Sequence, residues 1–450
     1  MLAARQLFEH GQTTERTVEA TARLADALGI RASLLPRWGE LTIRFDGEDG
    51  ARYAVAASEP VGVDMGKVAA TVHVIDDICD GRIAAEAAHD ALAATGHLAA
   101  GSVARFALLA AAGAAALGVI FGATDAVGLF LIALSAGSGA CLRRWLEGIG
   151  HNRFVQPFCA ALLAGAVGAV VVHLQLSPAQ RLIAVCPCMI LVPGPHLLSG
   201  TLDLARARIA LGACRIGYAG MTIMMICTGL LVGLSLGGVQ LPASEASNPV
   251  PFGYDVLAAG VAVAAYGTFF AMPWRMLPIP IAIGMVAHAA RWATTDLAGG
   301  SVEMGALVAC LLVGIVVTPI TDRLRLPFAA FAFASVVSLI PGVFLFRAAG
   351  GLVALVAQGA NASPALLLGI VVDATTALLI ILAMAFGLIV PKMLIEHFFP
   401  GIVGRRATGD TAGAASPPGV SAGLAPERRV LRSTVQSPAP PDGSMRDREC

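Results

Sequence analysis

Asp373 points most clearly to chemistry, because it is a carboxylate inside a long apolar segment. It lies about ten residues into the segment 364–390. A carboxylate at the centre of a bilayer costs about 2.5–3.5 kcal/mol unless it faces water or a polar partner. A partly desolvated carboxylate also titrates closer to neutral pH than a free one. We therefore predict that Asp373 is a proton-coupling group. The alternative is a shallower helix that leaves Asp373 solvated near a membrane boundary.

Two Pro-Gly turns interrupt hydrophobic segments and are the next candidates. They are Pro193-Gly194 and Pro341-Gly342. Proline removes a backbone donor and breaks the helical hydrogen-bond ladder. Such breaks persist at membrane depth only where they line a cavity or are buried in protein. We predict that both turns belong to a substrate or translocation site.

Three polar residues follow these turns. His196 could recognise a carboxylate or take up a proton, or it marks the inner interface where its segment ends. Asp203 either belongs to the site or accepts hydrogen bonds from a helix N-terminus or pairs with Arg206. Arg347 could hold an anionic group with two hydrogen bonds, or it is an interfacial arginine at a helix end.

The turns also mark an internal repeat. Their prolines are separated by 341 − 193 = 148 residues. A second pair of landmarks, Arg144-Trp145 and Arg291-Trp292, is separated by 291 − 144 = 147 residues. Two independent landmarks with nearly the same spacing indicate an internal duplication.

The elements that position these residues are mostly membrane spans. The chain has 450 residues, of which 57% are hydrophobic and only 13% charged, too few to cover a soluble protein of this length. Residues 1–102 are mixed in composition, residues 103–400 are almost continuously apolar, and residues 404–450 are rich in Pro, Ala, Gly and Ser. We expect the last region to be a disordered cytoplasmic tail.

The first region has the pattern of a small soluble α/β domain. Helical spacing covers Leu2–Gly29, with Gly29 as a plausible C-cap, and returns at 64–79 and 83–92. Between them, 33–35, 41–45 and 53–55 have the composition of short strands.

The apolar region divides into about ten spans, most of them long enough to cross a hydrocarbon core of about 30 Å. They form two five-span modules, 103–237 and 253–390. Because five is odd, the second module must be inverted relative to the first. The fold class is therefore a polytopic α-helical membrane protein with two inverted five-helix repeats after the α/β domain. The expected spans are 103–121, 125–142, 155–175, 181–198, 212–237, 253–272, 276–293, 304–320, 326–346 and 364–390.

Loop charges predict the orientation. With the N-terminus inside, nine arginines fall on inner loops and three on outer loops, so both termini are expected in the cytoplasm. The inner group is Arg143, Arg144, Arg153, Arg206, Arg208, Arg215, Arg275, Arg323 and Arg325, and the outer group is Arg181, Arg291 and Arg347. The longest outer loop, 238–252, contains no lysine or arginine.

Other chemistries lack a sequence signal. The chain has no Walker loop, no His-Glu-x-x-His motif and no nucleophile elbow, so we expect neither an enzyme nor a cofactor or metal. The formal net charge of zero gives no reason to expect a nucleic-acid partner. His173 and His288 are single histidines in spans and are expected to be interhelical hydrogen-bond donors.

The chain resembles the bacterial threonine/serine exporter family over about residues 5–395. The resemblance is carried by three stretches: Leu7 to Val18 with Leu24 and Leu28-Gly29, then Val192-Pro193-Gly194 with Asp203, Arg206, Gly212 and Arg215, and finally Ile340-Pro341-Gly342 with Phe346-Arg347. It implies a secondary transporter of the bacterial plasma (inner) membrane that exports small amino acids with the proton-motive force. Its partners would be substrate, protons and lipid, and a homo-oligomer is compatible with it.

Two rival functions stay open. Related transporters whose modules are separate chains are associated with succinate export, so a dicarboxylate exporter is one alternative. Arg347 and His196 acting as carboxylate ligands would favour it. The other alternative is a non-transporting membrane scaffold whose soluble domain binds a partner. It would be favoured if Asp373 and both Pro-Gly turns faced lipid or closed packing.

Overall fold

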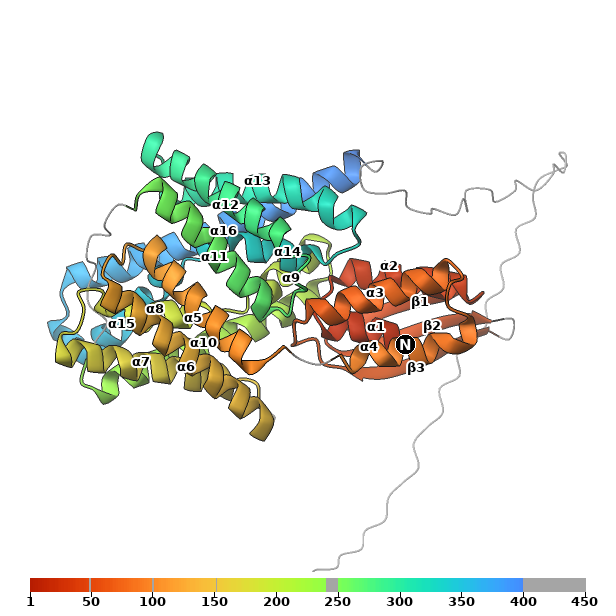
Figure 1. Ribbon diagram of the computed structural model, residues 1–450, viewed down its shortest axis with the longest axis horizontal. Coiled ribbons are helices and arrows are strands. Elements are labelled where there is room, and N and C mark those ends of the chain that lie inside the picture. The colour runs from red at the N-terminus through yellow and green to blue at the C-terminus, as the bar shows by residue number, and fades with distance from the viewer. Residues whose placement is uncertain (48–49, 99–100, 151, 240–249, 400–450) are drawn as a thin grey trace, which may run out of the picture. The chain divides into compact units, whose positions relative to one another are not determined.

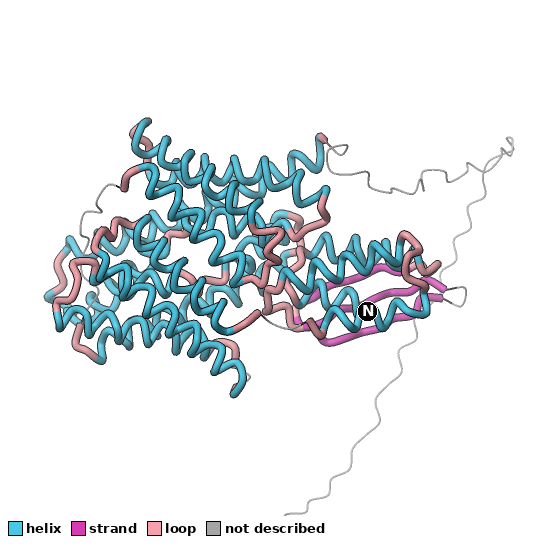
Figure 2. Tube along the Cα trace, viewed as in Figure 1, coloured by secondary structure: helices cyan, strands magenta, loops and turns pink. Residues whose placement is uncertain are grey.

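The computed structural model of this protein describes residues 1–47, 50–98, 101–150, 152–239 and 250–399. Within these residues the chain is mainly helical, with one small sheet near the N-terminus (Figures 1 and 2). The predicted disordered tail, 404–450, and most of the predicted outer loop, 238–252, lie outside the described residues. The described residues therefore carry the membrane helices and the candidate site.

The N-terminal region is an α/β layer, as its sequence predicts. Helices pack on one face of an antiparallel sheet of order β1-β2-β3, in which Leu34 pairs with Ile43. These two residues and Leu41 are buried against Ala4 and Phe8. The elements are α1 (Leu2–Glu9), α2 (Thr14–Ala27), β1 (Ala32–Arg37), β2 (Gly39–Gly47), β3 (Gly50–Ser58), α3 (Met65–Cys79), η1 (Ala85–Ala87) and α4 (Ala88–Gly96).

The predicted single helix Leu2–Gly29 is wrong. It is interrupted between α1 and α2, where Gly11 has a φ of 92°, a conformation that ends a right-handed helix. The predicted C-cap at Gly29 is confirmed by its φ of 69° just after α2.

The remaining helices form the apolar part of the chain. They include two short 3₁₀ segments and one π segment. In chain order they are α5 (Val103–Ile120), α6 (Ala126–Ile149), α7 (Val155–Leu174), α8 (Gln180–Met189), α9 (Gly194–Ala205), α10 (Ile209–Leu236), α11 (Phe252–Phe269), α12 (Pro278–Trp292), η2 (Ala293–Leu297), α13 (Val302–Arg323), α14 (Phe328–Val336), η3 (Val337–Leu339), α15 (Gly342–Gln358), η4 (Gly359–Asn361) and α16 (Pro364–Phe398).

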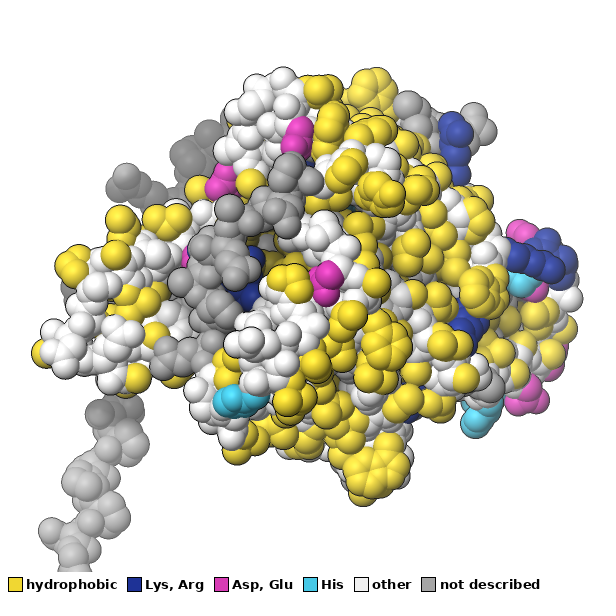
Figure 3. All heavy atoms as spheres, turned by 60° about the vertical axis from the view of Figure 1, so that its left-hand side comes forward, with side chains coloured by type: hydrophobic (Ala, Val, Ile, Leu, Met, Phe, Trp, Pro, Cys, Tyr) yellow, Lys and Arg dark blue, Asp and Glu magenta, His cyan; other side chains and the backbone are white. Residues whose placement is uncertain are grey.

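Eight of the described helical segments are long and apolar enough to cross a membrane, and the bent pair α8 and α9 gives a ninth. Their outward faces are apolar: Leu108, Leu236 and Val356 are 70%, 75% and 83% exposed. Figure 3 shows apolar side chains over most of the viewed face, with few charged ones among them. This surface is typical of helices that contact lipid tails. The count of ten crossings stays a prediction, since α12 has only 15 residues.

Both predicted Pro-Gly breaks are confirmed. The helix α8 ends at Met189 and α9 begins at Gly194, with a bend of 54° between them. In the second module η3 ends at Leu339 and α15 begins at Gly342. The predicted ninth span, 326–346, is therefore wrong in its bounds, because the turn at Pro341 separates α14 from a longer helix that continues to Gln358.

The two modules share a packing pattern. Their third and fifth helices run against each other, α7 with α10 and α13 with α16. Both pairs approach closely at glycines: a Cβ on Gly229 would lie 2.3 Å from the Phe158 carbonyl, and one on Gly387 would lie 2.6 Å from Cys310. The first helices, α5 and α11, pack across the two modules. This correspondence agrees with a duplication, while the inversion of the repeat stays a prediction.

Candidate functional site

Each of the two Pro-Gly breaks contacts the module that contains the other break. A Cβ added to Gly194, at the start of α9, would lie 1.5 Å from the ring of Phe333 on α14. A Cβ on Gly342, at the start of α15, would lie 2.7 Å from Met189 at the end of α8. Each break is therefore capped by a side chain of the short helix that precedes the other break. Any side chain larger than hydrogen at Gly194 would displace the Phe333 ring.

Both breaks have the same local backbone. The amide of Gly194 donates to the carbonyl of Val192 at 2.9 Å, and the amide of Gly342 donates to the carbonyl of Ile340 at 2.8 Å. Pro193 and Pro341 are the N-caps of the helices that follow. The N-termini of α9 and α15 therefore begin inside the packed protein, where the positive end of a helix dipole favours a negative group.

A cavity of about 70 Å³ lies between the two breaks. We call it the break cavity. Its walls are almost wholly apolar, and Thr201 supplies the hydroxyl among them. The lining residues are Val192, Gly194, Leu197, Leu198, Thr201, Ile223, Phe333, Ile340, Pro341, Leu345, Ile381, Met384, Ala385 and Leu388. Contributions from both modules mean that a relative movement of the modules would reshape this cavity.

A larger, polar cavity of about 400 Å³ lies between the N-terminal region and the helices. We call it the vestibule. Its charged lining comprises four cationic and two acidic side chains, in addition to His10 and His196: Lys67, Arg143, Arg144, Arg153, Asp64 and Glu147. Val192 lines both the vestibule and the break cavity. The first break is therefore the wall between a cationic chamber and an apolar one.

Arg143 is a cation of the vestibule whose guanidinium has unused hydrogen-bond donors. Its guanidinium lies over the ring of Phe269, 4.7 Å from the ring centre. Its Nε and Nη1 atoms are buried and make no hydrogen bond within the described part of the chain. Neighbouring Arg144, by contrast, pairs with Glu147 at 3.1 Å. Sequence reasoning counted Arg143 only as an inner-loop charge. Neither its residue type nor its predicted position in a loop indicated a role in substrate binding.

His196 lines the vestibule directly after the first break. Its Nε2 lies 3.2 Å from the carbonyl of Val61 in the N-terminal region, and its ring packs edge-on against Tyr218 at 5.0 Å. Its Nδ1 is buried and has no hydrogen-bond partner among the described residues. The helix does not end at His196, because α9 continues to Ala205. The alternative that His196 marks the inner interface stays a prediction.

Arg347 and Asp373 form an ion pair at 3.0 Å between α15 and α16. Asp373 is 6% exposed, so it is buried against a polar partner, as its sequence position requires. Arg347 lies in the sixth position of α15 and not at a helix end. The pair is near the break cavity but outside it: Ile381, which lines that cavity, follows Asp373 on α16 by 381 − 373 = 8 residues, or about 12 Å.

Asp203 lies at the end of α9 that faces the N-terminal region, away from the breaks. It pairs with the fully buried Arg215 at 3.1 Å and accepts a hydrogen bond from Thr14 of α2 at 3.0 Å. The predicted partner, Arg206, reaches Glu396 on α16 at 2.6 Å and also contacts Glu15. Asp203 therefore docks the N-terminal region and is not part of the break cavity.

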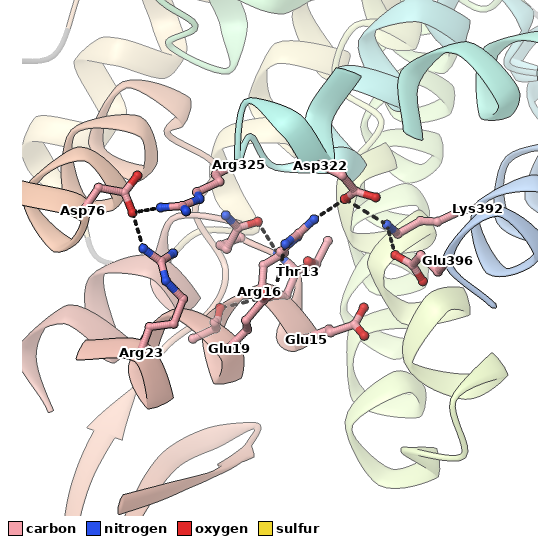
Figure 4. A network of polar contacts seen from close by, with 12 residues as sticks. Thr13, Glu15, Arg16, Glu19, Arg23, Asp76, Asp322, Arg325, Lys392 and Glu396 are labelled. Atoms are coloured by element: carbon pink, nitrogen blue, oxygen red, sulfur yellow. Dashed lines mark hydrogen bonds and ion pairs between the residues drawn. The ribbon is translucent and has the colours of Figure 1, made fainter. Parts of the chain in front are cut away.

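This docking extends to the second module (Figure 4). Arg16 of α2 contacts Asp322 at the end of α13, and Lys392 of α16 lies 3.9 Å from the same carboxylate. We call Arg16, Asp322, Lys392 and Glu396 the docking network. Burial lowers the pKa of the Arg16 guanidinium, but Asp322 and Glu19 raise it, and the net pKa is above its ordinary value. Arg16 therefore stays charged at every working pH.

The second break has a polar contact that sequence reasoning did not find. Ser338, in η3 just before the break, lies 2.5 Å from Nε2 of His288 on α12. Nδ1 of the same ring lies 3.0 Å from Asp255 on α11, which also pairs with Arg291 at 2.7 Å. The prediction of His288 as an interhelical donor is confirmed, but its two partners were not foreseeable. They are separated from it by 33 and 50 residues.

Comparison with known families gives a consistent result. A family model described as "Putative threonine/serine exporter" matches residues 1–237, more than half of the chain. A second model, described as "Threonine/Serine exporter, ThrE", matches residues 255–394. No curated protein and no solved structure matches the chain. The two models meet between the two modules, so each module carries its own family signature. With its apolar helices and both matches, the protein belongs to the threonine/serine exporter family of membrane transporters.

Proposed function

We propose that this protein is a secondary exporter of small hydroxylated amino acids, threonine and serine, driven by the proton-motive force across the bacterial inner membrane. The observation that carries the proposal is the crossed arrangement of the two breaks around one cavity, with Val192 as the wall to the vestibule. Many secondary transporters bind substrate at such discontinuous helices near the bilayer midplane.

The amino acid would enter from the vestibule. Arg143 has unused donors for a carboxylate, and the N-terminus of α9 begins next to the shared wall. The break cavity is too small in this conformation for a whole amino acid. The described conformation therefore fits a state in which the vestibule is accessible and the passage between the modules is closed.

We propose that the vestibule faces the cytoplasm and that the chain crosses the membrane ten times. The predicted inner loops gather at the N-terminal region, which supports this orientation. Glu59 lies 3.7 Å from Arg153, the amide of Met65 donates to the Phe270 carbonyl at 2.8 Å, and Asp76 contacts Arg325. Labelling of single cysteines with a membrane-impermeant maleimide tests it: a cysteine at Asp90 should react only in inverted vesicles, and one at Leu297 only in intact cells.

Asp373 is the proposed coupling group. Its carboxylate neutralises Arg347 while ionised, and protonation would release that arginine. A proton taken up on one side would then change the contact between α15 and α16, which both flank the break cavity. In this scheme, proton binding is coupled to transport because it changes the charge at the contact between α15 and α16.

A dicarboxylate exporter remains the second candidate, favoured by the four cations of the vestibule against two carboxylates. A divalent anion would use more of these cations than a zwitterion. The deciding experiment is efflux from vesicles that contain the purified protein and are preloaded with labelled threonine, serine or succinate. We expect export of threonine and serine that accelerates with an imposed proton gradient. Export of succinate alone would overturn the amino-acid assignment, and no export of any of the three would overturn both.

A further inference from the structure

We propose that Asp255, His288 and Ser338 form a second proton-binding site, which acts on the second break. The inference rests on the proposed proton-driven transport and adds a site to it. Three elements supply the site: Asp255 comes from α11, His288 from α12 and Ser338 from η3. Both Asp255 and His288 have no exposed side-chain surface, and Ser338 is 2% exposed.

The chain of contacts resembles the Ser-His-Asp arrangement of hydrolases, but its burial excludes that chemistry. A nucleophile must reach its substrate, and the hydroxyl of Ser338 is enclosed. What a buried imidazole between a carboxylate and a hydroxyl can do is bind and release a proton. Histidine is suited to this role because its ordinary pKa lies close to neutral pH.

The hydrogen bonds define where the proton would bind. Asp255 accepts from Arg291 at 2.7 Å, which keeps its carboxylate ionised, and it lies 3.0 Å from Nδ1 of His288. The neutral ring therefore carries its hydrogen on Nδ1, and Nε2 accepts the hydroxyl hydrogen of Ser338. A proton from water binds at Nε2, and the net charge of Asp255, His288 and Arg291 rises from zero to +1.

Binding of this proton reverses the contact with η3. Once Nε2 carries a hydrogen, it donates to Ser338, and the serine hydroxyl must turn its own hydrogen to another acceptor. Ser338 precedes Ile340 and Pro341, which line the break cavity. A charge change on α12 is thereby transmitted to the backbone turn of the second break, and release of the proton to water restores the first arrangement.

The groups around His288 make its protonation depend on the conformation of the site. Asp255 and Arg291 are the charged groups that act on His288 in the structure. The neighbouring elements place Asp296 of η2 in an exposed position and Glu303 of α13 in a partly exposed one. An uncompensated positive charge in this apolar setting is costly, so the protonated state would favour a conformation in which the site is open to water.

The second break is consequently held on both sides by titratable groups. Ser338, which precedes the turn, is bound to His288, and Arg347, which follows it, is bound to Asp373. The first break has different contacts: the Tyr266 hydroxyl donates to the Met189 carbonyl at 2.7 Å, and His196 contacts Val61. The proposed switch acts on the second break through these contacts of Ser338 and Arg347.

The test uses Trp292, which lies one helical turn beyond His288 on α12. Residues four apart on a helix lie on the same face, so we expect a change of charge on His288 to alter the emission of Trp292. In a full-length protein with Trp38→Phe, Trp145→Phe and Trp274→Phe, we expect the emission of Trp292 to titrate as the pH is lowered. The titration should disappear with His288→Gln and persist with His173→Gln, a matched substitution in the first module. No titration, or the same titration in the His288→Gln protein, overturns the proposal.

This measurement needs no substrate, so it is independent of the amino-acid assignment. The second arm uses Ser338→Ala, which leaves the imidazole and Asp255 in place. We expect the Trp292 titration of this variant to remain. Gradient-driven efflux of threonine should fall about tenfold, a size typical of the coupling between two sites, while exchange without a gradient should stay within about twofold of the wild-type rate. Equal losses of efflux and exchange would show a structural role and overturn the link to the break.

Discussion

Gly194, the first residue of α9, lies directly against the ring of Phe333 on α14. An added Cβ would come within 1.5 Å of that ring, so the hydrogen side chain of Gly194 is what allows the two modules to meet at the first break. The contact joins residues 333 − 194 = 139 apart in the chain and forms one wall of the break cavity. Closure of the passage between the two modules should therefore depend on this contact.

Replacing Gly194 with alanine should stop transport. The added methyl group must displace Phe333, and overpacking of this kind costs about 1–3 kcal/mol. Efflux of threonine from vesicles measures the effect. The control is Gly217→Ala on α10, where an added Cβ meets nothing within 4 Å. Adding Phe333→Ala to the Gly194→Ala protein should restore part of the efflux, and failure to do so would mean that the steric contact is not the cause.

Asp373→Asn should separate gradient-driven efflux from exchange. The amide keeps the shape of the side chain but cannot carry a proton or neutralise Arg347. We expect gradient-driven efflux to fall about tenfold, while exchange without a gradient falls much less. Asp296→Asn, at an exposed position, is the control. Wild-type efflux with an unchanged pH dependence in Asp373→Asn would exclude Asp373 as a coupling group.

The effects of substituting Arg347 and Asp373 on thermal stability should not be additive. Removing one partner of a buried pair leaves an uncompensated charge, which is more harmful than removing both. We therefore expect the double variant Arg347→Gln and Asp373→Asn to unfold in detergent at a higher temperature than Arg347→Gln alone. A double variant less stable than either single variant would contradict this account of the pair.

Arg143→Gln should weaken substrate binding more than turnover. The loss of a charge-assisted hydrogen bond of about 1.5–3 kcal/mol corresponds to a rise of about tenfold or more in the half-saturating substrate concentration. The measurement is the concentration dependence of efflux. Arg275→Gln is the control, since Arg275 is exposed and does not line the vestibule. A change confined to the maximal rate would show that Arg143 does not bind substrate.

Arg16→Ala should loosen the N-terminal region. Asp322 is 2% exposed and would lose its contact with α2, at a cost of about 1–3 kcal/mol. Limited proteolysis should then cleave the chain between 98 and 103 faster than in the wild type. Arg5→Ala is the control, because Arg5 is half exposed and its ion pair among the described residues is with Glu9 of the same helix. Since Arg16 keeps its charge across the working range, raising the pH from 6 to 9 should not mimic the variant.

Much of the fold was predictable because it depends on short-range patterns. Apolar runs identify spans, proline and glycine identify helix ends, and both operate within a few residues. The breaks at Pro193 and Pro341 were predicted for this reason. The errors have local causes as well: the ninth span was joined across Pro341, and the first helix was joined across Gly11, because an apolar or amphipathic rhythm continues through both turns.

By itself, the sequence determined most of the apolar helices, where two segments break and which residues are costly to bury, because hydrophobicity and backbone conformation are properties of neighbouring residues. Only the tertiary structure decided the partners. Asp203 could have met Arg206 but pairs with Arg215, Asp373 meets Arg347, and His288 lies between Asp255 and Ser338. A side chain at a helix surface can face several neighbours, and the choice among them follows from the packing of helices far apart in the chain.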